Sequence, residues 1–95
     1  MAFVYILYSK IIDGYYTGFT PGLVEERIHK HNSKFYKNKY TAKASDWTLY
    51  LKINCQSELQ ARKIELHIKK MKSRKYITDL KKYAEMTEAL LKKYA

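Results

Sequence analysis

The chain has 95 residues, and its 19 lysines and arginines outnumber its 9 aspartates and glutamates to give a formal net charge of +10 at pH 7. This length fits a single domain with a modest core, and so large a charge predicts a polyanionic partner. No apolar run approaches the roughly 20 residues that span a bilayer, no signal peptide opens the chain, and the single cysteine, Cys55, favours a reducing compartment, so we expect a cytoplasmic nucleic-acid-binding protein without membrane contact.

Two aromatic segments near the start of the chain predict a β-hairpin. Residues 3–8 and 15–19 are rich in β-branched and aromatic side chains, and an Asp-Gly pair between them is a turn signal. Side-chain alternation lets Tyr5 meet Tyr16, and Gly18 leaves space beside Tyr16 for a backbone or a ligand. The hairpin alone permits two interpretations: a pocket at the tyrosines, or tyrosines that pack against helices as core residues.

A helix is predicted next, over residues 21–31. Thr20 can act as its N-cap, and Pro21 suits the first helical position because no amide hydrogen is needed there. Arg27 and His31 are four residues apart and therefore lie on one face, which is either a functional face or an ordinary solvated one. The apolar side of this helix is expected to consist of Leu23, Val24 and Ile28.

Residues 32–46 show no sustained apolar period, which predicts a basic loop with room for a helical turn. Its lysines and tyrosines can contact phosphates and stack on bases, although a solvated loop explains the same composition. Tyr36 is one of these aromatic residues. The residues that we expect to bind nucleic acid are Arg27, Lys34, Lys37, Lys39, Tyr40 and Lys43.

A third strand and a second long helix follow. Residues 47–55 alternate, so that one face is expected to hold Trp47, Leu49, Leu51, Ile53 and Cys55. Ser57 opens a capping box with Gln60, and the helix is expected to last to about Met71. Its buried stripe is predicted to be Ala61, Ile64, Ile68 and Met71.

Glu65 borders this buried stripe, so its carboxylate needs a partner. Lys69 stands at the favourable i,i+4 spacing and would form an ordinary salt bridge. The other candidate partner is a divalent metal. His29 and His67 lie far apart in the sequence without companion ligands, which argues against zinc.

Residues 73–95 are lysine-rich and helical in pattern, with Ser73 as the cap. They form either one helix or two, with possible breaks at Thr78-Asp79 and Ala84-Glu85. The two apolar stripes of this segment are Tyr76, Ile77, Leu80 and Tyr83, then Met86, Leu90 and Leu91. The predicted fold is α+β, a three-stranded antiparallel sheet flanked by helices, with residues 1–80 as the main unit and 81–95 as a C-terminal helical extension of the same domain.

The order of these residues resembles the GIY-YIG nuclease superfamily. Phe3-Val4-Tyr5 stands where the family has Gly-Ile-Tyr, and Tyr16-Thr17-Gly18 stands where it has Tyr-Ile-Gly. Arg27, His31 and Glu65 match by position. The chain is similar to the small stand-alone branch, and to the nuclease domain of excision-repair incision proteins and homing endonucleases, which implies a role in DNA repair.

The resemblance implies an endonuclease that hydrolyses phosphodiester bonds in DNA with one divalent metal, Mg²⁺ or Mn²⁺. Glu65 would hold the metal, Arg27 would clamp the phosphate, Tyr16 would activate the water and Tyr5 would position it. The pKa of Tyr16 would then have to be lowered by nearby cations or by water bound to the metal. His31 would orient Tyr16, relay its proton or contact phosphate.

The substrate is expected to be single-stranded or structured DNA, and the protein a monomer or a homodimer. Two departures from the family pattern motivate an alternative, a basic nucleic-acid-binding module that keeps the fold without catalysis. Phe3 replaces the first glycine, and Ile77 and Thr78 stand where many members have an asparagine. A third hypothesis is a small interaction protein whose C-terminal helix docks on another chain.

Overall fold

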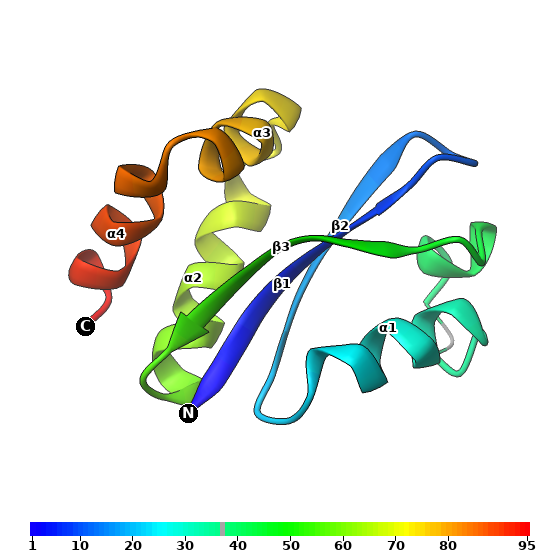
Figure 1. The fold of residues 1–95 in the computed structure, drawn as a ribbon, viewed down its shortest axis with the longest axis horizontal. Helices are drawn as coiled ribbons and strands as arrows, with labels where there is room; N and C mark the ends of the chain where they lie inside the picture. The colour runs from blue at the N-terminus through cyan, green and yellow to red at the C-terminus, as the bar shows by residue number, and fades with distance from the viewer. Residues whose placement is uncertain (37) are drawn as a thin grey trace.

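The computed structural model describes residues 1–36 and 38–95 of the chain. In the order of the sequence, the elements are β1 (Ala2–Ser9), β2 (Gly14–Thr20), α1 (Val24–Asn32), the short 3-10 helix η1 (Thr41–Lys43), β3 (Thr48–Cys55), α2 (Glu58–Met71), α3 (Arg74–Lys82) and α4 (Ala84–Lys93). The sheet is antiparallel with strand order β2-β1-β3. Helix α1 lies on one side of it, whereas α2, α3 and α4 lie on the other (Figure 1). The predicted α+β fold, including the extra C-terminal helix, is confirmed.

The hairpin forms as predicted, with opposite faces of its strands in two cores. Tyr5 and Leu7 lie in the cluster on the α1 side, and Tyr16 packs against that cluster. Val4 and Ile6 point to the α2 side. Successive side chains of a strand point to opposite faces of the sheet. Tyr5 therefore lies on the face of β1 that α1 covers.

The turn of the hairpin is held by two segments that are distant in the sequence. Asp13 has φ 47°, a left-handed conformation that Asp adopts more readily than most residues. The Asp46 carboxylate accepts hydrogen bonds from the backbone amides of Lys10 and Ile11 at 3.0 and 3.2 Å. Arg74 at the start of α3 pairs with Asp13, with 3.0 Å between Nη2 and Oδ1. The turn is thereby fixed against the loop before β3 and the start of α3.

The predicted single face of β3 is wrong because the strand contains a bulge. Pairing with β1 shifts register between Ile6 and Leu7, which face Leu51 and Leu49 respectively. The extra residue, Tyr50, reverses the alternation. Trp47 is therefore in the core cluster on the α1 side, whereas the second half of β3 faces the α2 side. Two residues of the predicted face are more open to solvent than expected, Leu49 (42% exposed) and Leu51 (half-buried).

Helix α1 starts later than predicted. Its N-cap position is Leu23, which has extended backbone angles and no side-chain cap. The Thr20 hydroxyl instead accepts a hydrogen bond from the Gly22 amide at 3.0 Å, which closes a short turn before the helix. Leu23 is 60% exposed, so only Val24 of the expected apolar residues is fully buried and Ile28 is partly so.

The far end of α1 is tied by one amide side chain to Trp47, the residue directly before β3. Asn32 Nδ2 donates to the Trp47 carbonyl at 2.9 Å, and its Oδ1 accepts from the Trp47 amide at 2.6 Å. Two bonds to one backbone residue fix both the position and the rotation of the helix end. This clamp sets the orientation of the α1 face that carries Arg27 and His31.

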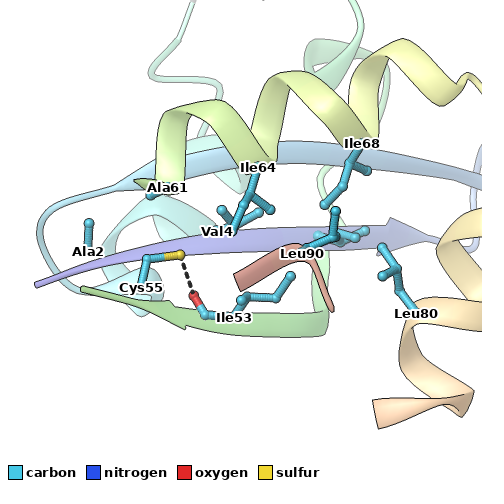
Figure 2. Close-up of a cluster of buried hydrophobic side chains, with 10 residues drawn as sticks. Ala2, Val4, Ile53, Cys55, Ala61, Ile64, Ile68, Leu80 and Leu90 are labelled. Atoms are coloured by element: carbon cyan, nitrogen blue, oxygen red, sulfur yellow. Dashed lines mark hydrogen bonds between the residues drawn. The ribbon is translucent and has the colours of Figure 1, made fainter. Parts of the chain in front are cut away.

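The larger core lies between the sheet and α2, and it includes α3 and α4 (Figure 2). Ser57 caps α2 by accepting from the Gln60 amide at 3.1 Å, as predicted, and Ala61, Ile64 and Ile68 are buried. Met71 is 45% exposed, because α2 ends there and Lys72 takes a left-handed φ of 47°.

The C-terminal segment forms two helices rather than one. They separate at Tyr83, whose extended backbone angles end α3, and Ser73 caps α3 as predicted. Leu80 and Leu90 are both buried in the same core as Val4 (Figure 2). The stripe of α4 therefore packs within its own chain, which removes the main basis for a docking helix, although Tyr83 is 41% exposed.

No helix among the described residues is both long and apolar enough to cross a membrane. Cys55 is a free, buried thiol, and burial raises its pKa. It lies in the core and not at the site described below.

Candidate active site

A pocket of about 500 Å³ lies at the β2 edge of the sheet and draws residues from both sides of it. Strands β1 and β2, helix α1 with the loop after it, and helix α2 all contribute. All five residues predicted to be catalytic meet here. The pocket is lined by Tyr5, Tyr16, Gly18, Phe19, Arg27, His31, Tyr36, Asn38 and Glu65.

Gly18 is needed because the Tyr5 ring occupies the space beside it. The two residues face each other across the β1–β2 ladder. A Cβ atom at Gly18 would lie 2.6 Å from both Cζ and the hydroxyl of Tyr5. The expected opening beside Tyr16 for a ligand is therefore filled by Tyr5, and the glycine serves close packing of a buried ring that is 2% exposed.

His31 is the central ring of the pocket. Its Nε2 lies 3.2 Å from the Tyr5 hydroxyl, and its ring centroid lies 4.8 Å from that of Tyr16 and 4.7 Å from that of Tyr36. Burial, reinforced by the nearby Arg27 charge, lowers the pKa of His31 to about 4. The imidazole is therefore neutral at pH 7 and able to accept or donate a hydrogen bond through either nitrogen according to its tautomer.

The Arg27 guanidinium forms part of the wall of the pocket. Among residues 1–36 and 38–95, no carboxylate oxygen lies within 4.0 Å of its nitrogens. Its Cζ lies 5.9 Å from the centroid of the Tyr36 ring, a cation–π contact. The charge is thus held by an aromatic face while its hydrogen-bond donors remain available for an anion.

Glu65 brings the only carboxylate among the described residues that line the pocket. Its side chain is 12% exposed and pairs with Lys69 at 3.4 Å, so the predicted i,i+4 salt bridge is present. Lys69 Nζ also lies 5.6 Å from the centroid of the Tyr16 ring. This lysine therefore connects the carboxylate to the phenol.

The pKa of Tyr16 is raised, contrary to the lowering that was expected. Burial is the largest cause, followed by the negative charge of Glu65 and by Tyr36. A side-chain hydrogen bond from Asn38 and the charge of Arg27 act in the opposite direction but do not prevail. Burial likewise raises the pKa of Tyr5. Both phenols keep their protons at neutral pH in this arrangement.

The sequence of this domain was compared with models of known protein families. The family model of the GIY-YIG catalytic domain matches residues 1–84. The chain belongs to the GIY-YIG family. Searches of curated proteins and of solved structures give no significant match.

GIY-YIG proteins form a nuclease family that generally uses divalent metals and acts on nucleic acid. The pocket fits such an ion in one respect, since Glu65 supplies a single, partly buried carboxylate that opens onto it. Mg²⁺ is commonly held by one or two carboxylates together with water and substrate phosphates. Within the described part of the chain, no group of three or more His, Cys, Asp or Glu side chains could hold a metal, so a dedicated protein cage is absent there.

Four lining residues of this GIY-YIG pocket did not figure among the predicted catalytic residues, and two of them, Tyr36 and Asn38, carry polar side chains. Tyr36 was recognised only as an aromatic residue of the basic loop, and Asn38 carried no sequence signal. The Asn38 Oδ1 atom accepts hydrogen bonds from the amides of Tyr40 and Thr41 at 2.8 and 3.3 Å. These bonds start the 3-10 turn and hold the amide group of Asn38 at the pocket.

The predicted nucleic-acid-binding residues separate in the structure. Arg27 lines the pocket, whereas Tyr40 and Lys43 line a neighbouring groove. Lys34 and Lys39 are exposed on the loop and line neither hollow. Lys37 lies outside the described residues.

Proposed function

We propose that this GIY-YIG protein is a metal-dependent endonuclease that hydrolyses phosphodiester bonds in DNA. The observation that carries the proposal is the convergence of Tyr5, Tyr16, Arg27, His31 and Glu65 in one pocket of a nuclease-family domain. Phosphodiester hydrolysis needs an activated water and positive charge at the phosphate oxygens. The net charge of +10 favours a polyanionic substrate.

Arg27 is assigned to the phosphate. Its guanidinium has no carboxylate within 4.0 Å among the described residues, and it stands at the wall of the pocket. A planar fork binds two phosphate oxygens at once, and its fixed charge stabilises the negative charge that grows on them in the transition state. A lysine at this position would supply the charge without the two-point geometry.

Tyr16 is assigned to the attacking water, with Tyr5 and His31 behind it. Tyr5 holds the neutral imidazole through its hydroxyl at 3.2 Å, and the imidazole packs on the Tyr16 ring. This bond to Tyr5 favours an orienting role for His31 over direct contact with phosphate. Tyr16 takes the proton of the water as the phenolate, a role that requires its raised pKa to be lowered when metal and DNA are bound, and Tyr5 fixes where that water lies.

Glu65 is assigned to the metal, and Mg²⁺ or Mn²⁺ suits a site with one carboxylate. When bound, the ion supplies positive charge that offsets the Glu65 carboxylate, one of the causes of the raised Tyr16 pKa, and stabilises the phosphate oxygens. In the protein without a bound ion, the salt bridge from Lys69 holds the Glu65 carboxylate in place.

The test is nicking of supercoiled plasmid and cutting of single-stranded DNA with Mg²⁺ or Mn²⁺, with chelation by EDTA as the metal-free arm. Tyr16→Phe is expected to lower the rate by about 10²- to 10⁴-fold, the usual contribution of a general base. Arg27→Ala should cost about 10²- to 10³-fold, and Glu65→Ala should abolish metal-dependent cutting.

Matched controls exist on the exposed surface. Tyr83→Phe, Arg62→Ala and Glu88→Ala make the same chemical changes outside the pocket and should cut at the wild-type rate. An inert wild type under every condition, or undiminished cutting by Glu65→Ala, would refute the nuclease.

A second candidate function is a binding module without catalysis. The paired state of Glu65 and Lys69 and the raised pKa of Tyr16 favour it, together with Phe3 in place of the family glycine. It predicts salt-dependent DNA binding that needs no metal and is unchanged in Glu65→Ala. Binding without any cleavage would decide in its favour.

We further propose a cytoplasmic protein with a role in DNA repair. The free thiol of Cys55 supports the location, and the family's nuclease character supports the role. The protein is expected to be a monomer or a homodimer, which the mass in solution will distinguish.

A further inference from the structure

A second hollow of about 600 Å³ adjoins the pocket and shares Tyr16 with it. It runs between the β1–β2 turn and β2 on one side and the end of α2 with the start of α3 on the other. Tyr40 and Lys43 also line it. We call this hollow the basic groove. It leads away from the proposed reaction site, since Tyr16 stands in the walls of both hollows.

The basic groove carries a net positive charge, and two of its cations, Lys43 and Lys72, form no ion pair among the described residues. Four cationic side chains line it, namely Lys43, Lys69, Lys72 and Arg74. Asp13 is the only acidic residue among the described residues that line it, and its charge is taken up by Arg74 at 3.0 Å. Phosphates that follow one another along a nucleic-acid chain match such a row of cations.

The groove also presents an aromatic face. Tyr40 is 38% exposed, and Lys43 Nζ lies 5.9 Å from its ring centroid. The ring is firmly mounted, because Trp47 packs against it at 5.9 Å between centroids and the Tyr40 hydroxyl fills the place where Gly14 lacks a side chain. A rigid, half-open tyrosine beside a lysine is a stacking platform for a base.

An aromatic platform distinguishes single strands from duplex. In a duplex, both faces of each base are covered by the neighbouring bases, whereas an unpaired base offers a free face. A groove that served only duplex DNA would need cations for the phosphates and would gain nothing from Tyr40. The combination of cations and an open ring therefore fits an unpaired strand.

We propose that the basic groove binds an unpaired DNA strand, which passes Tyr16 and stacks a base on Tyr40. The inference rests on the proposed nuclease function, because the strand in the groove would be the substrate of that reaction. The substrate is then single-stranded or locally unpaired DNA. The lysines at positions 43 and 72 contact the phosphates of this strand, and Lys69 lies where the groove meets the pocket.

The test is binding of a short fluorescent oligothymidylate by anisotropy in EDTA, where no metal-dependent cutting takes place, with a hairpin duplex of equal length as the second probe. Tyr40→Leu is expected to weaken single-strand binding about 5- to 150-fold, the loss that follows from removing one stacked base, and Tyr40→Phe should bind as wild type does. The pair Lys43→Ala and Lys72→Ala should reduce the slope of log K against log salt by about 0.7 for each lysine.

The matched control is the pair Lys63→Ala and Lys93→Ala, which removes the same charge from residues that line a hollow between α2 and α4 and do not line the basic groove. It should leave single-strand binding close to the wild-type value. A direct measurement is photocrosslinking of an iodouracil-containing strand to wild-type protein, with Tyr40 expected as the crosslinked residue. This readout does not depend on whether a Tyr40 variant folds.

The proposal is overturned if the control pair weakens binding as much as the groove pair, or if Tyr40→Leu binds like wild type. It is also overturned if the hairpin duplex binds as tightly as the single strand through the same residues. Failure of the nuclease gives a different result, namely normal strand binding in EDTA without cutting when metal is added.

Discussion

Gly18→Ala is the sharpest test of how the pocket is packed. The added methyl group would lie 2.6 Å from both Cζ and the hydroxyl of Tyr5, well inside van der Waals contact. The ring cannot swing aside, because Tyr5 is 2% exposed and its hydroxyl bonds to His31. Overpacking of this kind costs about 1–3 kcal/mol. For a domain of this size, that cost lowers Tm by roughly 4–8 °C per kcal/mol.

The measurement is thermal and urea unfolding of Gly18→Ala beside Gly22→Ala. Gly22 is a matched control, since a Cβ there would meet only the Thr20 hydroxyl oxygen at 3.7 Å, an ordinary contact, and its φ is not positive. Gly22→Ala should be neutral, or more stable by about 0.4–1 kcal/mol through the unfolded chain. If Gly18→Ala is as stable as wild type, then the Tyr5 ring does not occupy the space beside Gly18 and the packing described above is incorrect.

Two further predictions concern rings of the pocket. The pKa of His31 is lowered to about 4 in the folded protein. Between about pH 6.5 and pH 4, the unfolded chain therefore binds a proton that the folded protein does not. The free energy of unfolding falls as the pH falls through this range, by about 3 kcal/mol at most. His31→Phe should flatten this dependence and exposed His29→Asn should not, with His67 retained in both; an unchanged slope in His31→Phe would contradict the assignment. The hydroxyl of Tyr36 is buried without a hydrogen-bond partner among the described residues, so Tyr36→Phe should raise the free energy of unfolding by about 1 kcal/mol, and a lower value would mean that the hydroxyl is satisfied.

Local patterns in the sequence predicted the elements but not all of their boundaries. Alternation and composition identified the hairpin, the third strand and the capped α2, because each depends on neighbouring residues. The start of α1 was wrong because Thr20 bonds to Gly22 in a turn instead of capping the helix. The face of Trp47 was wrong because a bulge at Tyr50 depends on pairing with β1, which no local pattern records.

The sequence predicted which residues form the candidate site better than it predicted their contacts and pKa shifts. The ordered tyrosines, Arg27, His31 and Glu65 were named from spacing and from the family resemblance, and the fold brings them together. Tyr36 and Asn38 were missed as pocket residues because the loop that carries them has no periodicity. Their position follows from the hydrogen bonds that the Asn38 side chain accepts from the amides of Tyr40 and Thr41, and from the packing of the Tyr36 ring against His31.

The sequence by itself determined the charge, the strands, the caps of α2 and α3 and the identity of the candidate reactive groups, since these follow from residue type and local spacing. The tertiary structure alone decided their environment. Burial, set by distant segments that close over the pocket, lowers the pKa of His31 and raises that of Tyr16. The tertiary structure also shows that the Tyr5 ring fills the space beside Gly18, and that a basic groove with Tyr40 in its wall opens beside Tyr16. Desolvation and close packing are properties of assembled surfaces, so they become readable only when the segments are in place.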